Sequence, residues 1–213
     1  MKRIRKSLIA SLCLLTVFVL WTLAICFVDV RMIGPEDTLV GFATVNAFVH
    51  NQTGIHWELY SITDWLGLVP IFVCMGFGAL GLSQWIKRKS ICKVDFDILV
   101  LGGFYIVTIA AFLFFESAVI NYRPVLIDGI LEASYPSSTT MLTLCVMPTA
   151  IIQFHRRIKN IIIRNSVVAA TIGFTAFMVI GRLISGVHWF TDIVGGVLLS
   201  AGLVMLYYSV SKK

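Results

Sequence analysis

Six long and mostly apolar stretches, separated by short polar segments, run along the 213 residues of this chain. A helix needs about 20 apolar residues to cross a bilayer, and backbone groups inside the bilayer must bond to one another. Hydrophobic residues make up 58% of the chain and charged residues 13%, which excludes an ordinary soluble domain. The stretches lie at about Leu8–Val28, Ile62–Gln84, Phe96–Phe115, Thr139–Gln153, Val167–Ser185 and Ile193–Val210. We therefore predict an all-α, polytopic membrane protein with six transmembrane helices, forming one integral membrane domain over residues 1–213.

Two prolines and one polar connection modify this layout. Pro148 lies in the fourth and shortest stretch, and Pro70 in the second predicts a kink. Between the first two stretches, Thr38–Val49 is semi-apolar and is expected to form an interfacial or re-entrant helix.

The formal charge of +6 could indicate a nucleic-acid partner, but the basic residues are arranged for a membrane instead. They precede or follow alternate stretches as Lys2, Arg3, Arg5 and Lys6; Lys87, Arg88, Lys89 and Lys93; Arg156, Arg157, Lys159 and Arg164; and Lys212 and Lys213. With six spans, these clusters share one side, whereas the other side holds only Arg31, Arg123 and Arg182. By the positive-inside rule, we expect both termini in the cytoplasm and no nucleic-acid partner.

The first stretch has the basic head of a signal peptide. Its apolar run exceeds the roughly 7–15 residues of a signal-peptide core, so we interpret it as a retained anchor in the cytoplasmic membrane. The five cysteines are scattered without metal or disulfide spacing, and we interpret them as small apolar packing residues. No metal-ligand cluster is visible in the sequence, and neither a metal nor another cofactor is expected.

Ionisable residues gather around the last two stretches, in the segment from Arg182 to Asp192. Charged groups beside a bilayer core are costly and are usually functional. On a helix, His188 and Asp192 would lie on one face, where the carboxylate can orient the imidazole. Such a histidine can attack a phosphorus centre, and the guanidinium of Arg182 can hold phosphate oxygens. Because alternating spans place the longer polar segments on the same side, these groups are expected at the outer interface.

Three short motifs together resemble those of the type 2 phosphatidic acid phosphatase family of membrane lipid phosphatases. They are Arg123-Pro124, Pro136-Ser137 and Arg182-x5-His188-x3-Asp192. The resemblance implies that family's helical core and a phosphohistidine formed on His188. It further implies that Asp192 orients His188 and that Arg123, Arg182 and Ser137 bind the substrate phosphate.

The first two motifs depart from the family pattern. Glu116 stands where the first motif begins with lysine, and Ser138 and Thr139 stand where the second continues with glycine and histidine. That histidine normally protonates the leaving group. Glu116, Ser138 and Thr139 are therefore possible site residues, and Glu116 or Thr139 could substitute for the missing groups. Gly181 similarly replaces the serine that opens the third motif.

Each residue also has a simpler interpretation. His188 could be an interfacial histidine without chemistry, Ser137 a helix N-cap, and Glu116 a partner of Arg123. The adjacent Gly195 and Gly196 are better explained by close helix packing than by chemistry.

The leading hypothesis is a metal-independent phosphatase acting on a lipid phosphate or diphosphate among the membrane lipids, with polyprenyl diphosphate favoured. Alternatives are a lipid phosphotransferase, a catalytically weakened lipid-binding member of the family, and a transporter. A transporter fits less well because its polar site usually lies at the bilayer midplane. The sequence specifies neither the lipid nor an oligomeric state.

Overall fold

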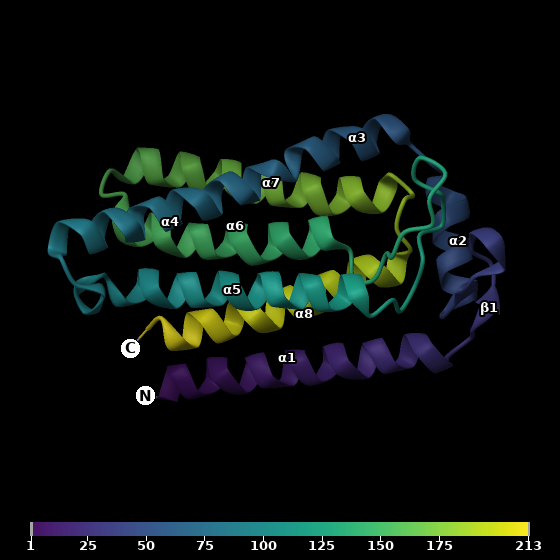
Figure 1. Cartoon of the computed structure of the whole chain (residues 1–213), viewed down its shortest axis with the longest axis horizontal. Helices are drawn as coiled ribbons and strands as arrows, with labels where there is room; N and C mark the ends of the chain where they lie inside the picture. Colours follow the sequence, from purple (N-terminus) through teal and green to yellow (C-terminus); the bar gives the residue numbers. More distant parts are fainter. Residues whose placement is uncertain (1, 213) are drawn as a thin grey trace.

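Six helices of 20 residues or more run side by side along the long axis of the molecule (Figure 1). The structure is a computed structural model that describes residues 2–212, with side chains from Ile4 to Lys212. The six helices are α1 Lys2–Phe27, α4 Leu68–Arg88, α5 Phe96–Ser117, α6 Ser138–Arg157, α7 Ile161–Ile184 and α8 Phe190–Val210. Each of the six predicted stretches is therefore helical, with the second divided between α3 Trp57–Leu66 and α4, and the predicted class of all-α membrane protein is confirmed.

The helices differ in how strongly they suit a lipid environment. Among the described residues, five helical segments are long and apolar enough to cross a membrane: Ile4–Phe27, Trp57–Arg88, Phe96–Ser117, Ile161–Ile184 and Phe190–Val210. The sixth long helix, α6, buries polar side chains against its neighbours, among them Thr140, Thr143 and Gln153. Its lower apolar content follows from this central position, because few of its side chains need to face lipid.

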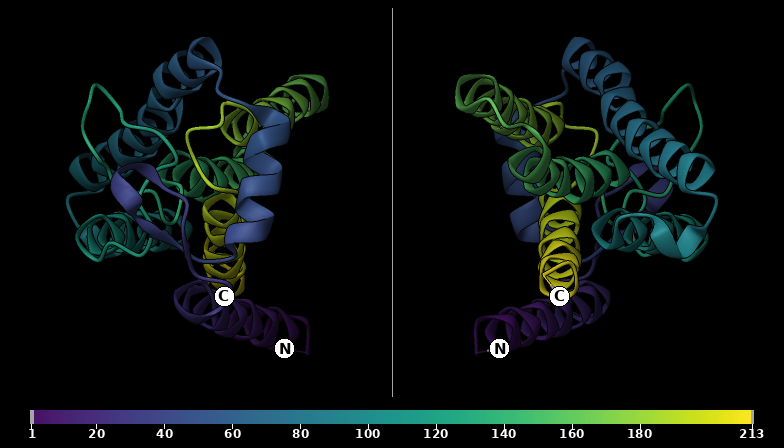
Figure 2. Two further views of the ribbon diagram at one scale, coloured as in Figure 1. Left: turned by 90° about the vertical axis from the view of Figure 1, so that its right-hand side faces the viewer. Right: turned by 90° about the vertical axis from the view of Figure 1, so that its left-hand side faces the viewer.

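The core lies around α6 and α8. In the most apolar window of α8, 50% of the residues are buried, against 6% for Trp57–Arg88 on the periphery. Figure 2 shows α8 between α1 and α6. Gly202 allows α1 to approach closely, because a Cβ there would lie 2.7 Å from Leu15.

One end of the bundle is closed by the segment between α1 and α4. This segment forms a short hairpin of β1 Arg31–Met32 and β2 Leu39–Val40 around a 3-10 turn, Pro35–Asp37, followed by α2 Ala43–Thr53 and α3 Trp57–Leu66. The helix expected over Thr38–Val49 is found in part, because residues 43–49 lie in α2 whereas Leu39–Val40 forms β2. α2 crosses the end of the bundle and, at 11 residues, is too short to span a bilayer (Figure 1).

The second apolar stretch breaks at Gly67, between α3 and α4, three residues before Pro70. Pro70 has no N–H to donate to the Leu66 carbonyl, so the break lies where a kink caused by Pro70 is expected.

Both chain termini lie at the opposite end, together with the loops after α4 and α6 (Figure 1). The loop after α4 includes a second 3-10 turn, Ile91–Lys93. Here Arg88 and Arg157 form ion pairs with Asp95, and Arg156 and Arg157 with Asp97. Hydrogen bonding to Arg88 contributes most to lowering the pKa of Asp95 to about 2. The basic residues of the sequence pattern therefore share this end; Lys213, which the pattern includes, lies outside the described residues.

Candidate functional site

The ionisable residues of the third motif lie at the end covered by α2 and α3. The turn from Ser185 to Trp189 joins α7 to α8 and carries His188. Gly186 adopts a φ of 71°, and a Cβ at this position would lie 1.9 Å from the carbonyl oxygen of Gly54. The His56 amide also donates to the Ser185 carbonyl at 3.0 Å. The turn is thus held against the segment that links α2 to α3.

The imidazole of His188 is buried, and its two nitrogens face different partners. Nε2 lies 3.2 Å from Nη1 of Arg123. A guanidinium can only donate hydrogen bonds, so Nε2 must be the acceptor and the neutral ring carries its proton on Nδ1. Nδ1 faces Oδ2 of Asp192 at 3.8 Å, which is longer than a hydrogen bond. This tautomer directs the lone pair of Nε2 toward Arg123.

Asp192 is fully buried at the start of α8. Its Oδ2 accepts from the Trp189 amide at 2.9 Å, and its Oδ1 accepts from Nδ2 of Asn121 at 3.2 Å. These bonds hold the carboxylate beside His188 without a direct hydrogen bond to the ring. Contacts of this kind often shorten only in the substrate complex.

Arg123 comes from the loop between α5 and α6. Its Nε lies 2.9 Å from Oε2 of Glu132, an ion pair without the alignment of a hydrogen bond. Its amide also donates to the Glu132 carbonyl, within a short paired segment that includes Tyr122 and Ala133. The loop therefore holds the guanidinium against His188.

Arg182 lies on the last turn of α7 and is almost fully buried. Its guanidinium donates to the Tyr60 carbonyl, Thr63 Oγ1, Asp64 Oδ1 and Thr139 Oγ1. Three of these four partners belong to α3. Gly181 allows α3 to approach, because a Cβ there would lie 2.9 Å from Cγ2 of Thr63. Close packing of α3 thus explains why glycine occupies this position.

The second-motif residues separate into different roles. Ser137 precedes α6, but its hydroxyl donates to Thr140 Oγ1 at 3.0 Å and does not cap the helix. Its amide donates to the backbone carbonyl of Asp192. Thr139 faces Arg182, whereas Ser138 lines a pocket together with His188.

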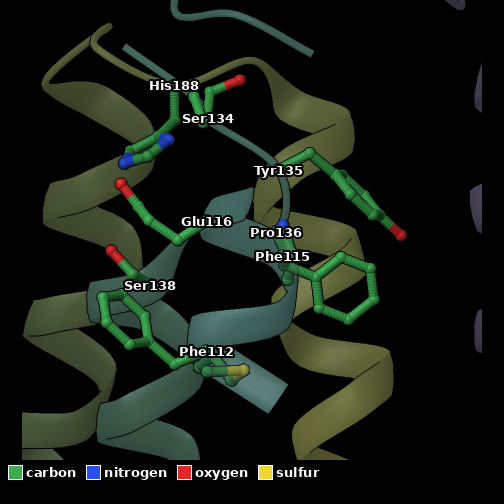
Figure 3. A pocket seen from close by; sticks show the side chains of 10 residues that line it. Phe112, Phe115, Glu116, Ser134, Tyr135, Pro136, Ser138 and His188 are labelled. Carbon is green, nitrogen blue, oxygen red and sulfur yellow. The ribbon is translucent and has the colours of Figure 1, made fainter. Parts of the chain in front are cut away.

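Glu116 lines this same pocket from the last turn of α5. Figure 3 shows its carboxyl group pointing toward the His188 ring, with Ser138, Phe112 and Phe115 nearby. Glu116 makes no ion pair with Arg123 in the described structure; Glu132 takes that place. Of the two candidates for the missing proton donor, Glu116 is therefore the one beside His188.

Burial lowers the pKa of His188 well below 6.5, and the positive charges of Arg123 and Arg182 lower it further. A protonated imidazole would be a third cation in a buried space. The ring is therefore neutral near pH 7, as a nucleophile must be.

Sequence reasoning missed several residues that hold the motif side chains. Of these residues, Asp64 was the easiest to identify from the sequence, since it is an acidic residue inside an apolar stretch. Asn121 and Glu132 carry no comparable signal, because they lie in a loop whose path depends on the tertiary structure. Among the described residues, no group of three or more His, Cys, Asp or Glu side chains is arranged to hold a metal ion.

A family model described as the PAP2 superfamily matches residues 108–213 of this chain. The matched region contains Arg123, Ser137, Arg182, His188 and Asp192. The chain belongs to the PAP2 superfamily. This PAP2 protein therefore retains the third motif while differing in the first two.

The fold is also similar to a solved PAP2 structure. A crystal structure described as the first transmembrane PAP2-type phosphatidylglycerolphosphate phosphatase from Bacillus subtilis superposes with a TM-score of 0.62. The match covers 93% of this chain and 94% of the other, at 17% sequence identity. It supports a shared fold over nearly the whole chain. No curated protein matches the sequence.

Proposed function

We propose that this protein is a membrane lipid phosphatase that acts at the outer interface of the cytoplasmic membrane through a phosphohistidine. The observation that carries this proposal is the neutral His188, with its Nε2 3.2 Å from Arg123 and its Nδ1 facing Asp192. Membership of the PAP2 superfamily supports the same chemistry. Both termini would lie in the cytoplasm, because the described basic clusters share the end opposite the site.

In the proposed reaction, Nε2 of His188 attacks phosphorus and the bond to the leaving oxygen breaks. The bonding electrons depart with that oxygen, and the phosphoryl group remains on His188. Asp192 stabilises the positive charge that develops on the ring. Water then attacks the phosphohistidine, which releases inorganic phosphate and restores the neutral histidine.

Arg123 and Arg182 would stabilise the phosphoryl oxygens in both steps. Arg123 donates to Nε2 of His188, so it must turn toward the phosphate before the attack. The N-terminus of α6 would provide further hydrogen bonds, and the Ser137 hydroxyl would add one after it releases Thr140 Oγ1. No step requires a metal ion.

A lipid tail has a place beside this site. A groove of about 550 Å³ lies between α4, α5 and α6 and is mostly apolar. It shares Phe112, Ser138 and Met141 with the pocket that contains His188. Asp64, Ser138 and Thr139 line its polar part. A lipid in this groove could keep its tail in the bilayer while its phosphate reaches His188.

The favoured substrate is a lipid diphosphate, with polyprenyl diphosphate as the natural example. Cleaving a monophosphate expels an alkoxide that needs a proton, and the usual histidine donor is replaced by Thr139. Cleaving a diphosphate expels a phosphate, a much weaker base. Help from a general acid is worth roughly a hundred- to ten-thousand-fold when it is needed. The absence of this histidine should therefore lower the rate of monophosphate hydrolysis most.

A second candidate is hydrolysis of lipid monophosphates with Glu116 as the acid. The observation in its favour is that Glu116 lines the pocket of His188, whereas Thr139 bonds to Arg182. Glu116 could then protonate the leaving oxygen.

The primary test measures phosphate release from a panel of lipid mono- and diphosphates by purified protein in detergent. Wild type should release phosphate without added metal. His188→Ala should lose activity by several orders of magnitude, approaching the million-fold loss seen for other nucleophiles. Wild type should also form an acid-labile, base-stable phosphoenzyme that His188→Ala does not form. Full activity of pure His188→Ala would remove His188 from the mechanism.

The choice between the two substrate classes depends on Glu116 and Thr139. If the leaving-group argument holds, Glu116→Gln should leave diphosphate hydrolysis unchanged and Thr139→His should gain monophosphate activity. A wild-type preference for monophosphates that Glu116→Gln abolishes would favour the second candidate.

The same preparation tests the other members of the functional class. Transfer of phosphate to an added lipid or sugar acceptor, without release to water, would indicate a phosphotransferase. Lipid phosphate binding without phosphoenzyme or turnover would indicate a lipid-binding member.

A further inference from the structure

The guanidinium of Arg182 has almost no hydrogen-bonding capacity left for a substrate. An arginine side chain offers five N–H groups. Nη1 donates to the Tyr60 carbonyl at 3.3 Å and to Thr63 Oγ1 at 3.2 Å. Nη2 donates to Asp64 Oδ1 at 3.0 Å and to Thr139 Oγ1 at 2.9 Å. Of its nitrogens, only Nε has no partner in the described structure. A phosphate can therefore engage Nη1 or Nη2 fully only if one of these four acceptors withdraws.

Asp64 differs from the other three acceptors in charge and in exposure. The others are a neutral carbonyl and two neutral hydroxyls, whereas Asp64 presents a carboxylate. Its side chain is 57% exposed, against 2% for the Arg182 side chain that it contacts. An exposed side chain on the last turn of α3 can move away at small cost. Thr63 is fully buried and cannot do so as easily.

The position of Asp64 places it beside the expected path of the substrate. It lines the same groove as Ser138 and Thr139, next to the pocket of His188. Carboxylate and phosphate oxygens both form charge-assisted bonds to a guanidinium. Asp64 therefore occupies Arg182 in the way that a phosphate oxygen would.

We propose that Asp64 is an internal competitor that takes Arg182 back from phosphate and so promotes release of the inorganic product. The proposal rests on the proposed function, in which Arg182 binds the phosphoryl group. A lipid substrate offsets the competition through its tail in the groove, whereas free inorganic phosphate has no tail. The competition therefore removes a larger fraction of the binding free energy of inorganic phosphate than of the binding free energy of the lipid.

The test measures binding of inorganic phosphate to full-length protein in detergent, by calorimetry, with and without Asp64→Asn. Asparagine keeps the shape of aspartate and removes its charge. An exposed ion pair of this kind corresponds to an expected gain in phosphate affinity of roughly two- to fivefold. In the active enzyme, the inhibition constant for phosphate should fall by the same factor. Unchanged or weaker phosphate binding by Asp64→Asn would overturn the proposal and make Asp64 only a support for Arg182.

Glu58→Gln is the matched control, because it removes the same charge from the same helix. Glu58 is exposed in the first turn of α3 and makes no ion pair in the described structure. The phosphate affinity of Glu58→Gln should remain at the wild-type value. A gain equal to that of Asp64→Asn would mean that Asp64 acts only through the overall charge. Asp64→Ser provides a second variant with the same expected gain, should Asp64→Asn fold poorly.

Binding and turnover separate the two proposals. Because calorimetry does not require hydrolysis, it can also be run on His188→Ala with and without Asp64→Asn. A wild-type enzyme inactive on every lipid phosphate would contradict the proposed function, while the affinity ratio would still decide the role of Asp64.

Discussion

His188 is a buried imidazole whose environment favours the neutral form. Burial lowers its pKa, and two nearby guanidinium groups act in the same direction. The neutral imidazole is therefore both the form that can act as a nucleophile and the form that a buried position tolerates.

This lowered pKa predicts how stability depends on pH. The unfolded chain binds a proton at His188 near pH 6.5, whereas the folded protein binds it only at lower pH. The contribution of His188 to the free energy of unfolding is therefore fully present above about pH 6.5. It decreases as the pH falls, by at most about 1.4 kcal/mol per pH unit. Between pH 6.5 and 5, the melting temperature of wild type in detergent should fall more steeply than that of His188→Asn. Parallel curves for the two proteins would contradict this explanation.

Asn121 is expected to act through Asp192. It donates to Oδ1 of Asp192, so Asn121→Ala removes one of the donors that hold this buried carboxylate. We expect kcat to fall by roughly ten- to a hundredfold with KM nearly unchanged, as for other residues that orient a catalytic group. Steady-state kinetics on the best lipid substrate would measure this. Asn51→Ala, at an exposed position of α2, should behave as wild type; a rise in KM alone in Asn121→Ala would place Asn121 in substrate binding instead.

At the scale of the helices, the start of α8 is the element on which the site is built. Its first turn carries Asp192, and Asn46 of α2 bonds to both the amide and the hydroxyl of Thr191. One turn further along, α8 packs against Tyr135, which lines the His188 pocket. The site thus depends on close contact between α8 and the loop before α6.

Gly195→Ala tests that contact. The new Cβ would lie 2.4 Å from Cε2 of the buried Tyr135 ring. Replacing glycine by alanine in a helix usually stabilises by about 1 kcal/mol, but overpacking a core costs about 1–3 kcal/mol. Gly195→Ala should therefore lower the melting temperature and the rate of phosphate release together.

Gly173→Ala is the control for the effect of replacing glycine by alanine on the helix backbone alone. Gly173 lies on α7, and a Cβ there would meet no atom within 4 Å. This variant should keep full activity with an equal or higher melting temperature. Equal stability changes in the two variants would show that Tyr135 can move aside without cost.

At the scale of the whole molecule, charge divides the bundle into two ends. The described basic clusters share one end with both termini, and the residues of the candidate site lie at the other (Figure 1). Net positive loops remain in the cytoplasm during membrane insertion, so the site is expected to face outward.

This orientation predicts a labelling pattern in intact cells. In a variant without the five native cysteines, a cysteine at Asp128 should react with an impermeant thiol reagent. A cysteine at Lys159 should react only after the cells are opened. Phosphatase activity of each variant serves as the control for correct folding. The reverse labelling pattern would invert the topology and move the site to the cytoplasmic face.

The sequence alone determined the features that depend on local order. Apolar runs of helical length predicted the six long helices, because a bilayer-spanning segment must satisfy its own backbone. The spacing from Arg182 to Asp192 predicted one cluster, because residues so near in sequence share a helix end and a turn. The close packing at Gly195 and Gly196 was also predictable, because small residues mark close contacts. A Cβ at Gly196 would lie 3.3 Å from Cγ2 of Thr140 on α6, whereas Gly195 faces Tyr135 in the loop before α6.

Only the tertiary structure decided which distant residues meet. Arg123 reaches His188 across 65 positions, and Asp64 reaches Arg182 across 118. Both contacts depend on how the helices pack and how the loops cross the bundle end, and neither is encoded by a local pattern. The same packing brought Glu116 beside His188 and turned Thr139 toward Arg182, although the sequence left both as possible replacements for the missing histidine. Apolar periodicity specifies that a helix is buried or faces lipid, but complementary side-chain shapes, such as α3 against Gly181, decide which neighbour it meets.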